Sequence, residues 1–279
     1  MARQNFVLLN GQVLQEPRIF KDDEGNYLRA ICSVKTIRGV RDFGDNITHL
    51  KYDCPVILTG NPDKIAEIET WHKNDMVEIK GVITTKEIKK VTICEECGAT
   101  NKIDGTYTYI NPIFLERKET GITKEEGLEL LRKRCEISNY LMVVGTLCRD
   151  VDEFSTDKNL RIAQYQIAVN RKYRLKDSSA EERTDYPWVK SYGENAMDDI
   201  KAIHKGSVIL IDGMLQTREI VRSSTCCECG HVYKWNDQAM EIVPYQVEYL
   251  QNYTTSEEWE KQQLQAEEDA KAEIFESES

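Results

Sequence analysis

The sequence predicts a mainly β chain made of two tandem five-stranded barrels, each with one short helix. The first reason is an internal repeat. The segment Cys94–Gly98, with Cys at its first and fourth positions, recurs 132 residues later as Cys226–Gly230, and Gly81 matches Gly213 at the same offset. The second reason is length, because 279 residues suit two domains of about 120 residues each. The third is the order of the expected elements, which is the same in both copies.

The first copy, residues 4–116, has five strand-like segments and one helix. The helix begins where Asn61 supplies a cap and Pro62 suits the first helical position. Ile65, Ile68 and Trp71 then recur at helical spacing and give that helix one apolar face. A long hairpin arm between the last two strands carries the first cysteine pair. The expected strands are 6–14, 28–37, 51–59, 76–85 and 107–115.

The second copy, residues 138–253, repeats this order, with a helix at 196–204 and the second cysteine pair between its last two strands. Three strands, a helix and two strands is the order of a Greek-key barrel of the OB type. A doubly wound α/β fold would need a helix between most strands. We expect a helical linker at 117–137, opened by a Thr123–Glu126 capping box, and an acidic tail at 254–279. The expected strands are 140–147, 160–169, 186–192, 207–220 and 240–250.

Charge and hydropathy narrow the class of protein. The net charge is −11, but residues 256–279 hold nine acidic and two basic side chains, so the tail accounts for −7 and the rest of the chain for −4. An acidic total therefore does not exclude a nucleic-acid partner, because local patches decide that. No window approaches the ~18 apolar residues of a membrane span. The N-terminus leads directly into a strand, so we expect no signal peptide and a cytoplasmic protein.

The segment 186–192 is the most informative for function. In a strand, alternate side chains share a face, so Tyr186, Trp188, Lys190 and Tyr192 point the same way. Rings of this kind stack on bases for ~1–3 kcal/mol each, whatever the base, while cations follow the phosphates. The pattern predicts binding of single-stranded nucleic acid. The alternative is that the rings only cover one side of the barrel.

Several segments of the second copy carry a resemblance to a known family. They are 143–150, 169–174, 184–193 and 205–218, in that order. Together they resemble bacterial-type single-stranded DNA-binding proteins. The resemblance implies that Tyr186, Trp188 and Tyr192 occupy positions where that family stacks bases, and it places Tyr173 near another such position.

The remaining candidate contacts are basic and aromatic residues beside these segments. The first copy lacks the aromatic alternation, so a weaker role in contacting the DNA backbone or in extending the scaffold is expected for its residues. Trp235 follows the second cysteine pair and could stack on a base or cover the metal site. The further candidates for nucleic-acid binding are Arg171, Lys172, Arg174, Arg218, Lys234 and Trp235, with Arg29, Lys35, Arg38 and Phe43 in the first copy.

The two cysteine pairs together predict a structural zinc site. One Cys-x-x-Cys-Gly turn offers two thiolates, whereas structural zinc takes four ligands in a tetrahedron. Cys94, Cys97, Cys226 and Cys229 complete such a set, shared either within one chain or between chains. Cys227 is a spare candidate in the second arm, as is the nearby His231. A thioredoxin-like redox site would need a βαβ context that is missing.

The leading hypothesis is non-enzymatic, sequence-independent binding of single-stranded DNA in replication, repair, recombination or mobile-element transfer. The alternatives are an RNA-binding tandem OB protein and an interaction adaptor that works through its zinc arms and tail. The chain has no Walker motif, nucleophile–base constellation or carboxylate cluster with metal spacing, so no enzyme is expected. The resemblance implies four OB barrels per assembly, hence a homodimer, and a tail that recruits replication or recombination proteins. Ile274 and Phe275 fit that tail, but Glu276–Ser279 departs from it.

Overall fold

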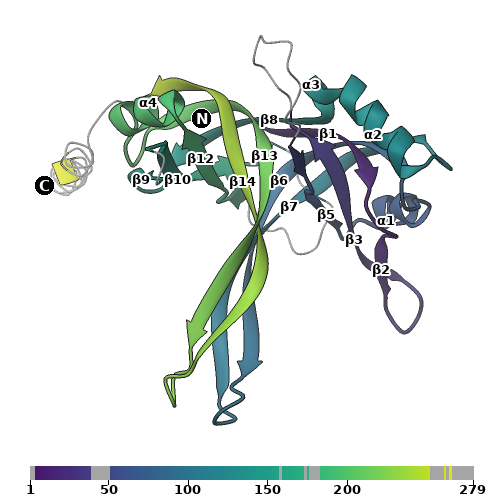
Figure 1. Cartoon of the computed structure of the whole chain (residues 1–279), viewed down its shortest axis with the longest axis horizontal. Helices are drawn as coiled ribbons and strands as arrows, with labels where there is room; N and C mark the ends of the chain where they lie inside the picture. Colours follow the sequence, from purple (N-terminus) through teal and green to yellow (C-terminus); the bar gives the residue numbers. More distant parts are fainter. Residues whose placement is uncertain are drawn as a thin grey trace, which may run out of the picture.

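The chain is mainly β, as the sequence predicts (Figure 1). The computed structural model describes residues 4–38, 51–156, 159–172, 175, 183–251, 261 and 264–265. The candidates Phe43, Tyr173 and Arg174 lie outside the described residues, as does nearly all of the expected acidic tail. No helix in these described ranges is both long and apolar enough to cross a membrane.

The first half of the chain closes five strands into a ring. β1 pairs with β3, β3 with β5, β5 with β7 in parallel, β7 with β6, and β6 again with β1. The short strands β2 and β4 pair antiparallel with opposite ends of β3, and α1 packs beside the ring. The elements are β1 (Asn5–Val13), β2 (Arg18–Lys21), β3 (Tyr27–Ile37), β4 (Tyr52–Asp53), β5 (Val56–Thr59), α1 (Pro62–Glu69), β6 (Met76–Ile93) and β7 (Thr100–Glu119).

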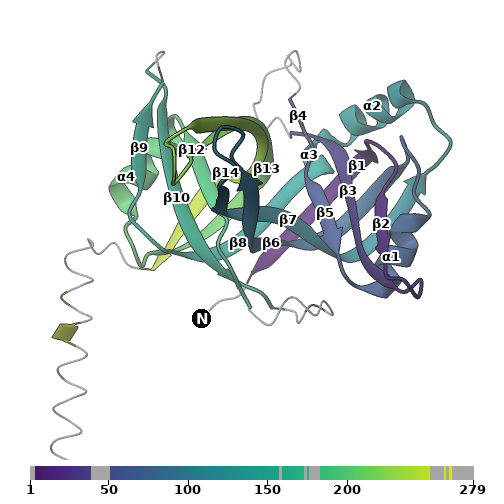
Figure 2. The ribbon, with the colours of Figure 1, turned by 90° about the horizontal axis from the view of Figure 1, so that it is seen from below.

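The second half repeats the ring with the same pairings. β8, β10, β12, β14 and β13 follow one another around it, and β12 and β14 form the parallel pair (Figure 2). Two short helices, α2 (Lys124–Lys133) and α3 (Cys135–Ser138), join the halves. The elements are β8 (Asn139–Leu147), β9 (Asp152–Ser155), β10 (Arg161–Asn170), β11 (Thr184–Asp185), β12 (Trp188–Tyr192), α4 (Glu194–Ala202), β13 (Val208–Thr225) and β14 (Val232–Gln251).

Local signals placed the helices well and the polar strands less well. The Asn61 side chain accepts a hydrogen bond from the amide of Asp63, and the Thr123 capping box is present. The expected strand 51–59 is divided into β4 and β5 at Cys54 and Pro55, since proline has no amide for the ladder. β2 and β9 were not predicted, because neither alternates apolar with polar residues. Both hairpin arms are regular β-structure almost to their cysteines.

The repeated glycines mark the same backbone contact in both halves. Gly81 and Gly213 each lie at a register shift in the last hairpin of their half. A Cβ at Gly81 would come within 2.6 Å of the carbonyl oxygen of Asn111, and one at Gly213 within 2.5 Å of that of Val243. No side chain fits at that distance, which explains why glycine recurs at this offset.

The halves join through a nearly symmetric contact. β1 and β8 pair antiparallel, with Asn5 opposite Val143 and Leu9 opposite Asn139, so one continuous sheet runs through both rings. Asn5 exchanges two hydrogen bonds of 2.9 Å with the backbone of Ile83, and Asn139 does the same with Leu215 at 2.7 and 2.9 Å. Both side chains are buried.

Two buried aspartates reach across this junction. The Asp53 carboxylate accepts from the Thr217 amide at 2.6 Å, and 132 residues later the Asp185 carboxylate accepts from the Thr85 amide at 2.9 Å. Each aspartate is fully buried and also paired with an arginine of its own half. Arg38 Nε lies 2.5 Å from an Asp53 carboxylate oxygen, and Arg171 Nε lies 2.7 Å from one of Asp185. These contacts fix the orientation of the two halves.

Replacing Asp185 with alanine should destabilise the fold strongly. The change removes a carboxylate partner from Arg171, which is only 5% exposed, and breaking a buried pair from one side costs ~3–5 kcal/mol. The control is Asp237→Ala, because its pair with Arg222 is about 40% exposed on both sides and such pairs contribute ~0–1 kcal/mol. Urea unfolding followed by circular dichroism measures both. Equal, small losses in the two variants would contradict the structural role of Asp185.

Candidate nucleic-acid interface and metal centre

The outward face of β12 carries the aromatic residues expected from the sequence. Tyr186, Trp188, Lys190 and Tyr192 are half-buried or exposed, whereas Pro187, Val189 and Ser191, which alternate with them, are buried. Tyr186 itself, just before β12, is 44% exposed. Three rings and one ammonium group therefore line one side of β12 and of the segment just before it.

The surroundings of β12 hold this face in place. From beneath, the Ser191 hydroxyl donates to the buried carboxylate of Asp199 on α4 at 2.6 Å, and Tyr165 donates to the same carboxylate at 3.0 Å. From the side, the Gln166 amide donates to the Tyr186 carbonyl at 3.0 Å. The Tyr186 amide donates at 2.8 Å to the hydroxyl of Thr85, which belongs to the first half. The rings are thus presented on a preorganised strand.

The cations near this face already have partners. Arg218 makes a bidentate pair with Glu241, at 2.9 and 2.8 Å, and Lys190 Nζ lies 4.0 Å from the same carboxylate. Burial lowers the pKa of Lys190, and Glu241 opposes that shift. Arg149, which the sequence did not single out, lies with its guanidinium carbon 5.8 Å from the centre of the Trp188 ring. A phosphate would compete with carboxylates for these groups.

The other cations of the second half that were predicted to contact nucleic acid are either buried in an ion pair or exposed. Arg171 is buried at the junction with Asp185, so its position is that of an ion-pair partner and not of an exposed phosphate ligand. Its loop sequence gave no sign of this, because the partner lies in another strand. Lys172, the next residue, is exposed, and so is Lys234 on the second arm.

Among the described residues, the first half has no equivalent aromatic face. At the 132-residue offset, Val56 takes the place of Trp188 and Leu58 that of Lys190. The predicted cations of this half are engaged locally. Arg29 lies over the Phe20 ring at 4.4 Å, Lys35 over the Tyr52 ring at 5.4 Å, and Arg38 pairs with Asp53.

The two hairpin arms, β6–β7 and β13–β14, extend side by side from the body (Figure 1). Along β14, the rings of Tyr233 and Trp235 lie 6.3 Å apart. Thr92 of the first arm and Tyr233 of the second share a hydrogen bond of 3.2 Å between their hydroxyls. Trp235 therefore belongs to a row of side chains between the arms.

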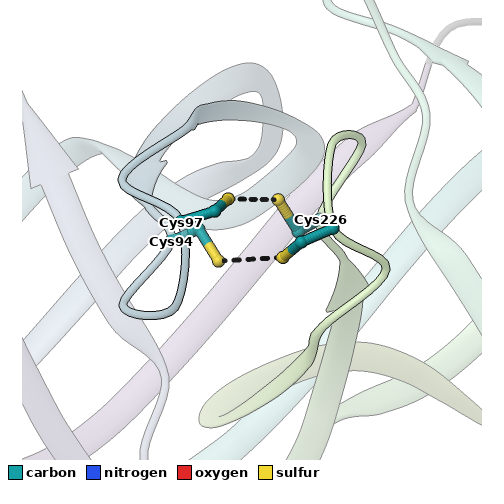
Figure 3. A group of neighbouring side chains, drawn as sticks. Cys94, Cys97 and Cys226 are labelled. Carbon is teal, nitrogen blue, oxygen red and sulfur yellow. Dashed lines mark hydrogen bonds between the residues drawn. The ribbon is translucent and has the colours of Figure 1, made fainter.

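The four cysteines predicted as metal ligands lie together where the arms end (Figure 3). Their sulfur atoms are all within 4.8 Å of one another. Cys94 Sγ is 3.6 Å from Cys229 Sγ, and Cys97 Sγ is 3.6 Å from Cys226 Sγ. Four thiolates at ~2.3 Å from a zinc ion would be about 3.8 Å apart. Among the described residues, these four cysteines are the group of metal-ligating side chains that lie close enough to share one ion. All four belong to the same chain, so the site needs no second chain.

The turn around Cys226 favours the thiolate of that residue, whereas neighbouring cysteine side chains help to raise the pKa of Cys97 and of Cys229. Gly98 and Gly230 adopt φ values of 73° and 74°, the left-handed region that glycine tolerates. Backbone amides of Cys229 and Glu228 lower the pKa of Cys226 to about 6, and the Asn101 side chain, 3.5 Å away, also donates to its sulfur. Cys227 is exposed and lies outside the cluster.

Comparisons with known proteins match this fold and this half of the chain. Residues 138–227 match the model of the single-strand binding protein family. A single-stranded DNA-binding protein of Helicobacter hepaticus is 29% identical over 101 residues, 36% of this chain and 51% of that protein. One from Staphylococcus epidermidis is 30% identical over 81 residues, 29% of this chain and 60% of that protein. The chain thus covers only about half to three fifths of these relatives.

A solved structure extends the likeness of fold to both halves. The wild-type single-stranded DNA binding protein from Thermus aquaticus superposes with a TM-score of 0.56 at 16% identity, covering 90% of this chain and 95% of that one. At this identity the likeness is one of fold alone. In sequence, residues 138–227 are similar to the single-strand binding protein family.

Proposed function

We propose that the protein binds single-stranded DNA without catalysis and without sequence preference. The observation that supports this most directly is the outward face of β12, where Tyr186, Trp188 and Tyr192 alternate with buried residues and Lys190 lies among them. Aromatic faces stack on any base, and flanking cations attract phosphates. A double helix hides the faces of its bases, so this surface suits unpaired strands.

The chain comprises two tandem OB units, residues 4–116 and 138–253, joined by a helical linker. The repeated ring of five strand pairings supports this division. The second unit supplies most of the stacking, since the first has Val56 and Leu58 on the equivalent strand. The first unit supports the geometry: Thr85 and Asp53 contact the second across the junction.

The four clustered cysteines hold one structural zinc ion. Support comes from the donor set and its spacing, because four sulfurs at 3.6–4.8 Å match tetrahedral thiolate coordination. Zinc bound there would link the ends of the arms and supply no chemistry to a reaction. Each arm provides two ligands, so neither could complete the site alone.

The proposed setting is replication, recombination or mobile-element transfer, where single strands are exposed. The relatives are described as single-stranded DNA-binding proteins, which supports that range of processes. A homodimer would bring together four OB units. Contacts between the acidic tail and replication or recombination proteins are part of the same proposal.

Binding of a fluorescent dT oligonucleotide tests this function. We expect the protein to bind the single strand much more tightly than a duplex of equal length, and the affinity to fall steadily as salt rises, because phosphate contacts release counterions. Fluorescence anisotropy measures both, and a single-stranded RNA competitor separates DNA from RNA binding. Equal affinity for single strand and duplex would contradict the proposal, and preference for RNA would favour the RNA-binding alternative.

A further inference from the structure

A groove lies between the two arms at their attachment to the body. Its volume is about 620 Å³, within the range of pockets that take organic ligands. Strands β7, β13 and β14 form most of its wall, and single residues of three other strands complete it: Ile88 of β6, Gln164 of β10 and Trp188 of β12. Because Trp188 lines both the groove and the outward face of β12, the groove continues that face towards the arms.

The walls of the groove present rings from both halves of the chain. Tyr107 comes from the first arm, Trp235 from the second, and Trp188 from β12. Burial raises the pKa of Tyr107, and the carboxylate of Asp237 on the opposite arm adds to the shift. Four apolar side chains also line the groove: Ile88, Ile103, Ile220 and Met240.

The charges in the groove do not favour phosphate. Arg218 is paired with Glu241 and Arg222 with Asp237, both in the lining. Asp104 adds a further carboxylate, so acidic groups outnumber basic ones among the lining residues. A phosphate chain would meet carboxylates there, whereas an uncharged planar base would meet aromatic rings and carboxylate acceptors for its amino groups.

We propose that this groove is a second binding site for unpaired nucleobases, in which Tyr107 of the first half stacks on bases of a strand that leaves the β12 face at Trp188. The proposal rests on the proposed binding of single-stranded DNA and assigns the first half a direct part in it. The sugar–phosphate chain of the bound strand would stay at the open side of the groove, outside the acidic lining.

The central test compares Tyr107→Ala with Tyr107→Phe and with Phe114→Ala, a control on the same strand that is exposed and outside the groove. We expect Tyr107→Ala to weaken binding of a dT oligonucleotide by about fivefold to a hundredfold, the range of one lost stacking contact. The Tyr107→Phe variant retains an aromatic ring and should therefore keep most of the affinity. The Phe114→Ala variant should bind like the wild type. Circular dichroism and thermal unfolding verify that each variant folds.

A second test uses the unmodified protein. An oligonucleotide carrying 5-iodouracil, irradiated in the complex, should crosslink to Tyr107 or Trp235, as located by mass spectrometry. The groove proposal is overturned if crosslinks occur only on β12 and Tyr107→Ala binds like the wild type. Failure of the wild type to bind any single strand would instead refute the proposed function itself, so the two outcomes are distinct.

Discussion

Replacing Cys226 with serine is expected to abolish tight zinc binding. The wild type should contain one zinc ion per chain, and the variant close to none, because a hydroxyl is a poor substitute for one of four thiolates. Structural zinc contributes ~10–16 kcal/mol of apparent binding free energy in small zinc domains, so its loss should also lower the unfolding temperature. The cluster lies at the ends of the arms, so we expect the arms to separate while the rest of the fold persists.

The matched control for this variant is Cys227→Ser. Cys227 is the next residue, is exposed and lies outside the cluster. It should leave the zinc content at one per chain. Elemental analysis with native mass gives the stoichiometry, and cobalt(II) substitution gives the absorption bands of tetrahedral thiolate coordination. One zinc per chain in Cys226→Ser, or zinc only in a dimer with half an ion per chain, would contradict a site formed within one chain.

Replacing Trp188 with alanine should produce the largest loss of DNA affinity from a single side chain. The indole lies on the outward face of β12 and also lines the groove between the arms. Losing one stacking contact costs ~1–3 kcal/mol, which is about fivefold to a hundredfold in affinity, and we expect the upper part of that range. Trp188→Phe should recover much of the loss, because a smaller ring still offers a face.

Val56→Ala is the corresponding control in the first half. Val56 stands 132 residues before Trp188 in the sequence and at the equivalent place on β5. Its replacement should change DNA affinity little. Anisotropy titrations at two salt concentrations measure all three variants, and the salt dependence of Trp188→Ala should match that of the wild type because no phosphate contact is lost. Wild-type affinity in Trp188→Ala would show that the β12 rings only cover the barrel.

Local patterns predicted those features of the site that lie within one strand or one turn. The period of two along 186–192 was enough to place Tyr186, Trp188, Lys190 and Tyr192 on one side. The spacing of the cysteines was enough to group them in pairs, and the need for four ligands brought the pairs together. The aromatic face depends on residues that are close in sequence, and the cysteine cluster depends on the fixed coordination number of zinc.

Features that depend on contacts between distant segments could not be predicted. Arg171 looks like a phosphate ligand in the sequence, and only the fold places it beside buried Asp185. Tyr107 gave no signal, since the groove that it lines is formed with a second arm that begins over a hundred residues later in the chain. A long hairpin arm was predicted, but the continuation of its strands almost to the cysteines was not, because the exposed arm residues mix polar and apolar side chains without a clear period.

The antiparallel contact of β1 with β8 has a consequence for how this protein responds to dilution and to mutation. Two separate subunits joined this way would come apart at low concentration, whereas here the partners share one chain and their association is unimolecular, so dilution cannot separate them. In a dimer of identical single-barrel subunits, every substitution would also appear on both sides of this contact. In this chain a residue can change on one side alone. Val56 and Trp188 can therefore differ, while Asp53 and Asp185 both still accept a hydrogen bond across the junction.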